Sequence, residues 1–124
     1  MNSRSLLWAG IVLIVVIGLI HLVQMPAEYA EAPYIGILFA TNFVGSLVAA
    51  VGIYRRQAWA WLLSILIGLG SLGGYVVSRT VGLPGMEVEA WLQPLGLLSL
   101  VAEAGIFLLF FMVKPWASLV PSRA

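Results

Sequence analysis

Residues 95–113 read LGLLSLVAEAGIFLLFFMV, and Glu103 is the only charged residue among them. A helix of this length spans about 29 Å at 1.5 Å per residue, close to the thickness of the hydrocarbon core of a bilayer. Because it lacks the polar face of a helix on a soluble domain, the stretch predicts a transmembrane helix. The chain has three more such runs, Leu6–Val23, Tyr34–Tyr54 and Ala58–Val77. The first is longer than the apolar part of a signal peptide, so we expect it to be a retained helix.

The composition agrees with four membrane spans. Of the 124 residues, 62% are hydrophobic and 9% are charged, whereas a soluble domain has about 25% charged residues. A chain this short cannot bury so much apolar surface in a core of its own, so lipid is the expected solvent for most of it. The sequence predicts an all-α fold, a single domain over residues 1–124 that forms a four-transmembrane-helix bundle with short loops.

Several function classes are excluded or disfavoured by the residue types present. The net charge is +1 and no basic stripe exists, which argues against a nucleic-acid partner. The absence of cysteine excludes disulfides, thiolate metal sites and thiol redox chemistry. The sequence shows no nucleophile–base pair, HExxH motif or glycine-rich phosphate loop, so a non-enzymatic role is favoured and no cofactor is specified.

The basic residues predict the orientation in the membrane. They precede the first run, separate the second from the third, and follow the fourth, whereas the other two connections are acidic except for Arg79. The positive-inside rule therefore predicts a multi-pass protein of the plasma membrane with both termini in the cytoplasm. The residues on which this rests are Arg4, Arg55, Arg56, Lys114 and Arg123 inside, and Glu28, Glu31, Glu87 and Glu89 outside.

The connections and an internal symmetry can also be predicted. Pro26 and Pro33 bracket the first outer connection, and Met86–Leu92 is expected to form a short helix at the membrane interface. The two halves of the chain align as a parallel repeat of two helical hairpins, although chance is the alternative explanation in a chain with 13 glycines. The matched spacings are His21 to Pro26 with Arg79 to Pro84, and Gly36 to Gly45 with Gly96 to Gly105.

One polar residue from each helix is expected in the outer half of the membrane. Glu103 lies about 12 Å below the outer hydrocarbon boundary, where a charged residue costs about 2.5–3.5 kcal/mol on insertion scales and usually marks a site or a pair. Asn42 lies at nearly the same depth, His21 is near the outer end of its helix, and Arg79 ends the third helix. These four residues are the candidate ligand-binding site.

Three interpretations of this cluster remain open at this point. Glu103 can be structural: neutral, paired with Arg79, or hydrogen-bonded to Asn42, and so hold the bundle in register. The cluster can instead line a functional pocket, or it can contact a partner subunit. His21 with Glu103 could also transfer protons on a lipid-like substrate, as in small four-helix isomerases.

A metal site is the sharpest functional version of the hypothesis. His21 and Met25 lie four residues apart on one helix face, and Glu28, Glu31 or Glu103 could complete the set. Imidazole with thioether suits copper, whereas imidazole with carboxylate suits zinc or iron. Haem is disfavoured because His21 and Met25, on one helical turn, cannot ligate opposite faces of a single haem.

The third connection carries a further motif. It reads SRTVGLP over residues 78–84 and is followed by Trp91, Pro94, Gly96 and Glu103. This SRTxGLP-type loop, together with the stretch from residue 21 to 33, resembles a pattern in small uncharacterised bacterial four-helix integral membrane proteins. The resemblance covers most of the chain and implies the four-helix fold and a bacterial inner membrane. It implies no known activity.

We therefore expect a non-enzymatic integral membrane protein, either an accessory subunit of a larger membrane complex or a self-associating helical bundle. The GxxxG at Gly70 and Gly74 mildly favours a homo-oligomer. Two alternatives stay open. One is a membrane protein that binds a metal or a small hydrophobic ligand in the outer half of the bundle, and the other is a small lipid-modifying enzyme.

Overall fold

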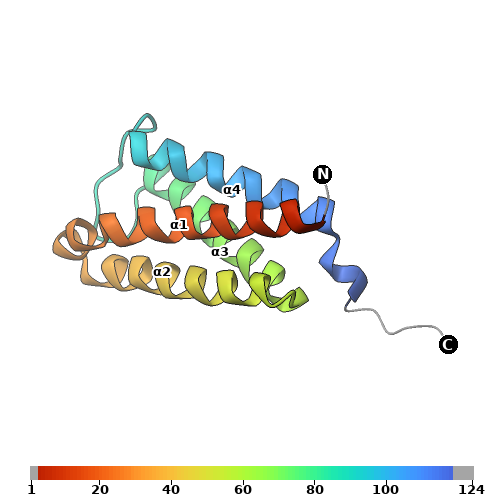
Figure 1. The fold of residues 1–124 in the computed structure, drawn as a ribbon. Helices are drawn as coiled ribbons and strands as arrows, with labels where there is room; N and C mark the ends of the chain where they lie inside the picture. Colours follow the sequence, from red (N-terminus) through yellow and green to blue (C-terminus); the bar gives the residue numbers. More distant parts are fainter. Residues whose placement is uncertain (1–2, 119–124) are drawn as a thin grey trace.

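The computed structural model describes residues 3–118, which form four long helices and one short 3-10 helix. The long helices are α1 (Ser3–Glu31), α2 (Pro33–Tyr54), α3 (Ala58–Thr80) and α4 (Pro94–Val113), and η1 (Pro115–Ser118) follows them (Figure 1). Each long helix is long and apolar enough to cross a membrane. The prediction of an all-α fold with four helices long and apolar enough to span a membrane is thus confirmed. Arg123, which contributed to the predicted orientation, lies outside the described residues.

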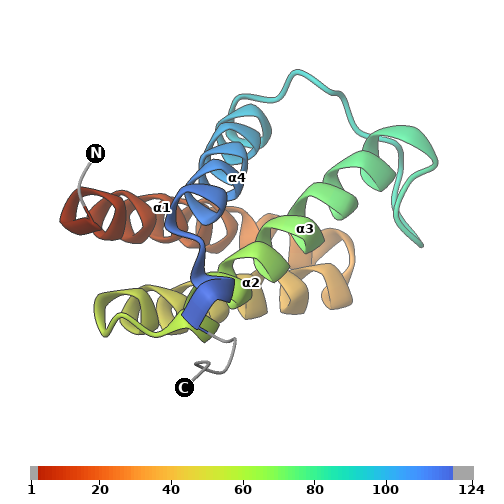
Figure 2. The same cartoon turned by 90° about the vertical axis from the view of Figure 1, so that its right-hand side faces the viewer.

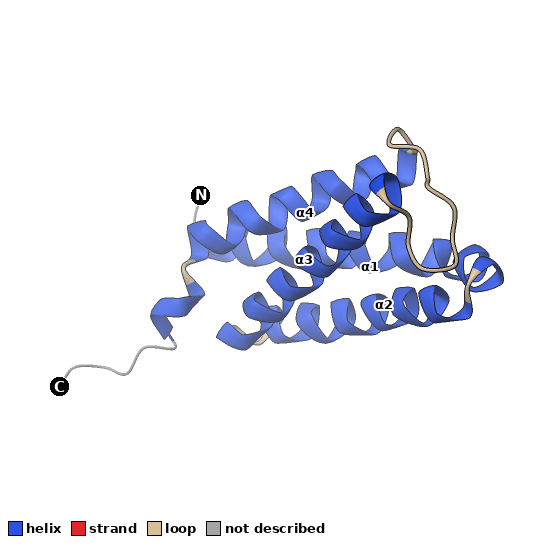
Figure 3. Cartoon of the chain, turned by 180° about the vertical axis from the view of Figure 1, so that it is seen from behind, coloured by secondary structure: helices blue, strands red, loops and turns tan. Residues whose placement is uncertain are grey.

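Consecutive helices run in opposite directions, so α1 begins and α4 ends at the same end of the bundle (Figure 1). We call this the terminal end, and the opposite one the loop end. At the loop end, α3 and α4 move apart, as Figure 2 shows. Residues 81–93, the long loop, connect these two helix ends (Figure 3). The bundle is therefore closed at its terminal end and spread at its loop end.

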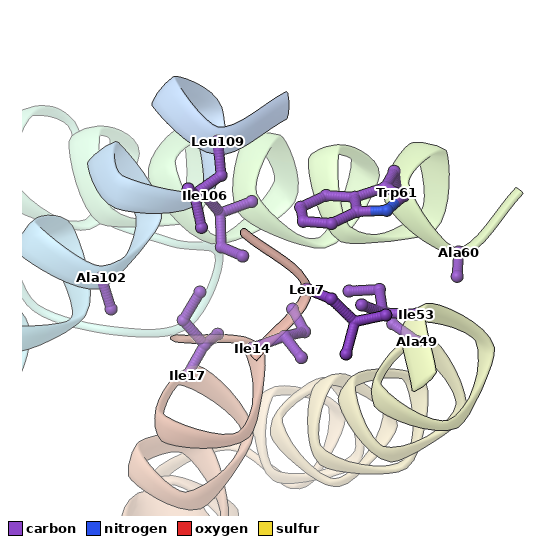
Figure 4. Close-up of a cluster of buried hydrophobic side chains, with 10 residues drawn as sticks. All are labelled: Leu7, Ile14, Ile17, Ala49, Ile53, Ala60, Trp61, Ala102, Ile106 and Leu109. Carbon is purple, nitrogen blue, oxygen red and sulfur yellow. The ribbon is translucent and has the colours of Figure 1, made fainter. Parts of the chain in front are cut away.

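The apolar core fills the terminal half of the bundle. Figure 4 shows ten buried side chains that come from all four long helices, among them the fully buried Ile14, Ile17 and Ile106. The indole of Trp61 lies across Gly10, where an added Cβ would be 2.4 Å from the ring. Only glycine fits at this close approach.

The first connection is shorter than predicted. α1 continues through Pro26 to Glu31 instead of ending near Val23, and only Ala32 separates it from α2. Pro26 removes one backbone donor, but proline is tolerated in membrane helices. Ala32 is extended, with φ −152° and ψ 111°, which is the conformation favoured before a proline, and Pro33 then starts α2.

The long loop is not helical, so the predicted interfacial helix at Met86–Leu92 is wrong. Besides one turn bond, from the Met86 N–H to the Leu83 carbonyl, the backbone of the long loop bonds to α3. The Glu89 N–H donates to the Ser78 carbonyl at 2.9 Å, and the Trp91 carbonyl accepts a hydrogen bond from the Tyr75 hydroxyl. These bonds fasten the loop across the loop end of the bundle.

Candidate functional site

A cavity of about 560 Å³ lies in the loop half of the bundle, and residues from all four long helices and the long loop line it. The four residues predicted as a ligand-binding site, His21, Asn42, Arg79 and Glu103, are all part of its wall. The structure therefore places the four predicted residues around one space. It does not join them into one hydrogen-bonded network, because each of them has different partners.

Glu103 is an isolated acid on α4. Its side chain is only 3% exposed, and its Oε1 accepts a hydrogen bond from the Ser99 hydroxyl at 3.0 Å, one turn earlier on the same helix. The other oxygen, Oε2, is buried and has no hydrogen-bond partner among residues 3–118. Neither of the partners suggested by the sequence, Arg79 and Asn42, pairs with this carboxylate in the described part of the chain.

Arg79, near the end of α3, binds the long loop through its guanidinium. It forms an ion pair with Glu89 at 3.0 Å, and its Cζ atom lies over the Tyr75 ring, 3.9 Å from the ring centre. Its remaining hydrogen bonds go to the Ser78 hydroxyl at 2.6 Å, the Gln93 side-chain oxygen at 2.8 Å and the Ala90 carbonyl at 3.1 Å. Arg79 therefore secures the cover of the cavity and offers no free charge to it.

His21 has a fixed tautomer when its ring is neutral. Its Nδ1 lies 2.8 Å from the Ile17 carbonyl, and because a carbonyl can only accept, Nδ1 must carry the hydrogen. Nε2 is then the nitrogen with a free lone pair. The ring also packs against Phe39, with 4.8 Å between ring centres.

Asn42 connects α2 to α3. Its amide nitrogen donates to the Ser71 hydroxyl at 2.8 Å, and its oxygen accepts from the Ser46 hydroxyl at 3.3 Å. Both ends of the amide are thus satisfied within the protein. Asn42 shapes the wall and links α2 to α3, with one of its two N–H donors already used.

The structure groups the acids of the loop end differently from the predicted metal set of His21, Met25 and Glu28. The carboxylates of Glu28, Glu31 and Glu89 have oxygens within 4.8 Å of one another, and among the residues that the structure describes this group does not include His21. Oxygen ligands of this kind suit hard cations rather than copper. Within the observed group of acids, Glu89 is already paired with Arg79. The predicted set of His21, Met25 and Glu28 stays a prediction.

Two contributors to the site were not found from the sequence. The first is the Arg79–Glu89 pair, whose members are ten residues apart and which no periodic pattern marks. The second is the open wall formed by Gly70 and Gly74, which line the cavity and where an added Cβ would meet no atom within 4 Å. A GxxxG motif predicts close helix packing, whereas none of the helices that the structure describes packs against these two glycines.

Comparison of the chain with protein-family models, with curated proteins and with solved structures gave no match. The function is therefore argued from the geometry and chemistry of the cavity itself.

Proposed function

We propose that this chain is an integral membrane protein that binds a small, largely apolar molecule in the cavity of its loop half. The observation that carries the proposal is the cavity, whose volume of about 560 Å³ falls within the ~300–1,000 Å³ of typical small-molecule sites. Its wall combines apolar side chains with a few inward polar groups, as such sites do. The cavity at the terminal end of the same bundle is smaller, about 210 Å³.

An apolar occupant has a direct route from the lipid. Leu38 on α2 and Leu66 on α3 belong to the cavity wall and are 57% and 66% exposed. In a bilayer, these parts of the wall face the acyl chains. Glu103, in contrast, is buried deep in the wall. A molecule with an apolar body and one polar group can therefore enter sideways and direct its polar group toward Glu103.

The proposal includes a location and an orientation. We place the protein in the plasma membrane of a bacterium, with both termini in the cytoplasm and the cavity in the outer half. Support comes from charge: Arg55 and Arg56 lie at the terminal end between α2 and α3, whereas three glutamates gather at the loop end. The positive-inside rule favours this arrangement. The parallel repeat stays a prediction. The two hairpins differ at the loop end, where α3 and α4 separate and α1 and α2 stay together (Figure 2).

Self-association, or attachment to a larger membrane complex as an accessory subunit, is the second candidate function. One observation favours it: an added Cβ at Gly70, Gly73 or Gly74 would meet nothing within 4 Å, so this side of α3 leaves room for another helix. The lipid-modifying enzyme has less support, namely that His21 and Glu103 line the same cavity.

A pair of glycine substitutions on α3 tests the binding proposal. Gly74→Leu puts a side chain into the cavity, whereas Gly73→Leu puts the same side chain beside it, at a position that is not part of the wall. Neither new Cβ meets an atom within 4 Å, so both variants should fold. Native mass spectrometry of the protein, transferred from its own membrane into lipid nanodiscs, measures bound mass and oligomeric state together.

Binding predicts an added mass on the wild-type protein and on the Gly73→Leu variant, and its loss from the Gly74→Leu variant with the oligomeric state unchanged. A bare mass for all three proteins would refute the binding proposal. A fixed oligomer without added mass, dissociated by either leucine, would support self-association through α3 in its place.

A further inference from the structure

We infer that the molecule bound in the cavity carries a protonated amine, so that the site takes lipophilic cations. This inference rests on the proposed function and adds the chemical class of the ligand. It follows from the hydrogen-bond donors and acceptors that the wall leaves unused.

The first unused acceptor is Oε2 of Glu103. This oxygen is buried without a partner, while Oε1 accepts a hydrogen bond from Ser99. A buried polar atom without a partner is costly, and native structures rarely keep one without a reason. Because the Ser99 hydroxyl donates to Oε1 only, Oε2 is left to accept a hydrogen bond from an occupant of the cavity.

The second unused acceptor is Nε2 of His21. Its other ring nitrogen donates to the Ile17 carbonyl, which makes Nε2 an acceptor in the neutral ring. His21 and Glu103 both line the cavity. The polar part of the wall therefore offers two acceptors that come from different helices, α1 and α4.

Arg79 and Asn42, the other two residues of the predicted site, donate to groups other than Glu103 and His21. The Arg79 guanidinium is bound to Glu89 and to groups of the long loop, and the Asn42 amide nitrogen is bound to Ser71. The charges in the wall are also unbalanced. Three acids and one base line the cavity: Glu28, Glu89 and Glu103 against Arg79.

A protonated primary amine matches these two unused acceptors, Oε2 of Glu103 and Nε2 of His21. An ammonium group has three donors and a positive charge, and charge-assisted bonds to a carboxylate are about twice as strong as neutral ones. A fatty acid or a phosphate would bring further acceptors and negative charge to a wall that already has an excess of both. A neutral alcohol would supply one donor and no positive charge.

Two probes of the same shape test the inference: 1-adamantylamine, which is charged at neutral pH, and 1-adamantanol, which is neutral. Their affinities are measured by calorimetric titration of the full chain in uncharged maltoside micelles. We expect the amine to bind about tenfold more tightly or better. Glu103→Gln should remove this preference, because it replaces the carboxylate with a neutral amide of the same shape. Glu87→Gln is the matched control, since Glu87 is exposed and lies outside the cavity wall, and it should keep the preference.

Equal affinity of the wild-type protein for the two probes would overturn the inference and leave the binding proposal intact. An amine preference that survives Glu103→Gln would also overturn it. Should Glu103→Gln fail to fold, as judged by circular dichroism and gel filtration, the comparison of the two probes on the wild-type protein decides. If neither probe binds, the inference is refuted, and the nanodisc masses then decide the proposed function separately.

Discussion

The contact between α1 and α2 at Gly18 supports a quantitative prediction. A Cβ at Gly18 would lie 2.7 Å from the Cβ of Ser46, whereas carbon atoms in contact are about 3.5–4.0 Å apart. Gly18→Ala therefore forces the two helices apart by about 1 Å, or distorts them locally. Overpacking of this kind costs about 1–3 kcal/mol, which lowers the folding equilibrium constant by roughly 5- to 150-fold.

The assay is reversible unfolding in mixed micelles of maltoside and SDS. Gly73→Ala is the control, because it makes the same change on a long apolar helix where the added Cβ meets nothing within 4 Å. Gly18→Ala should unfold at a clearly lower SDS fraction than Gly73→Ala. A double-mutant cycle with Ser46→Gly, which removes the clashing carbon, should recover most of the loss. Equal stability of the two alanine variants would mean that α1 and α2 are not packed this closely.

Three further predictions concern the cover of the cavity, the link between two helices, and α1. Arg79→Gln removes the ion pair with Glu89, so amide hydrogens of the long loop should exchange faster while those of the helices do not; unchanged loop exchange would speak against its role as a fastener. Asn42→Ala breaks the bonds to Ser71 and Ser46, and the loss of the bond between α2 and α3 should cost about 0.6 kcal/mol, at most ~1.7, in the SDS assay; a larger loss would indicate a wider network. Pro26→Ala should leave the helical content by circular dichroism unchanged, because α1 already continues past this residue; a rise would place the end of the helix at the proline.

The helices could be predicted from sequence because lipid imposes a simple requirement. Every backbone polar group must be satisfied within a span, and apolar side chains must face outward, so the four apolar runs coincide with the four long helices. The end of α1 was misplaced because a proline was taken as a boundary. One missing donor at Pro26 was not enough to stop a helix that could continue through Glu31 and turn at Ala32.

The sequence indicated four residues that line the cavity, but not the groups with which they form hydrogen bonds and ion pairs. A rare polar residue in each apolar helix indicated the four wall residues, because burying such groups in a membrane needs a reason. The partner of Arg79 could not be foreseen, since Glu89 reaches it only through the path of the long loop. The unpartnered oxygen of Glu103 could not be inferred from composition or spacing either, because it depends on which side chains of the other helices reach it.

The central claim is that Glu103 meets the charged group of a cavity-bound amine. It is tested most directly by solid-state NMR in lipid bilayers, with 15N-labelled 1-adamantylamine and protein labelled with 13C at the glutamate carboxyls. The account predicts that the 15N label dephases a glutamate carboxyl signal, which reports a separation of about 3–4 Å between nitrogen and carboxyl carbon, and that Glu103→Gln removes this effect. A bound amine that leaves this signal unaffected, or that dephases only carboxyls still present after Glu103→Gln, would contradict it.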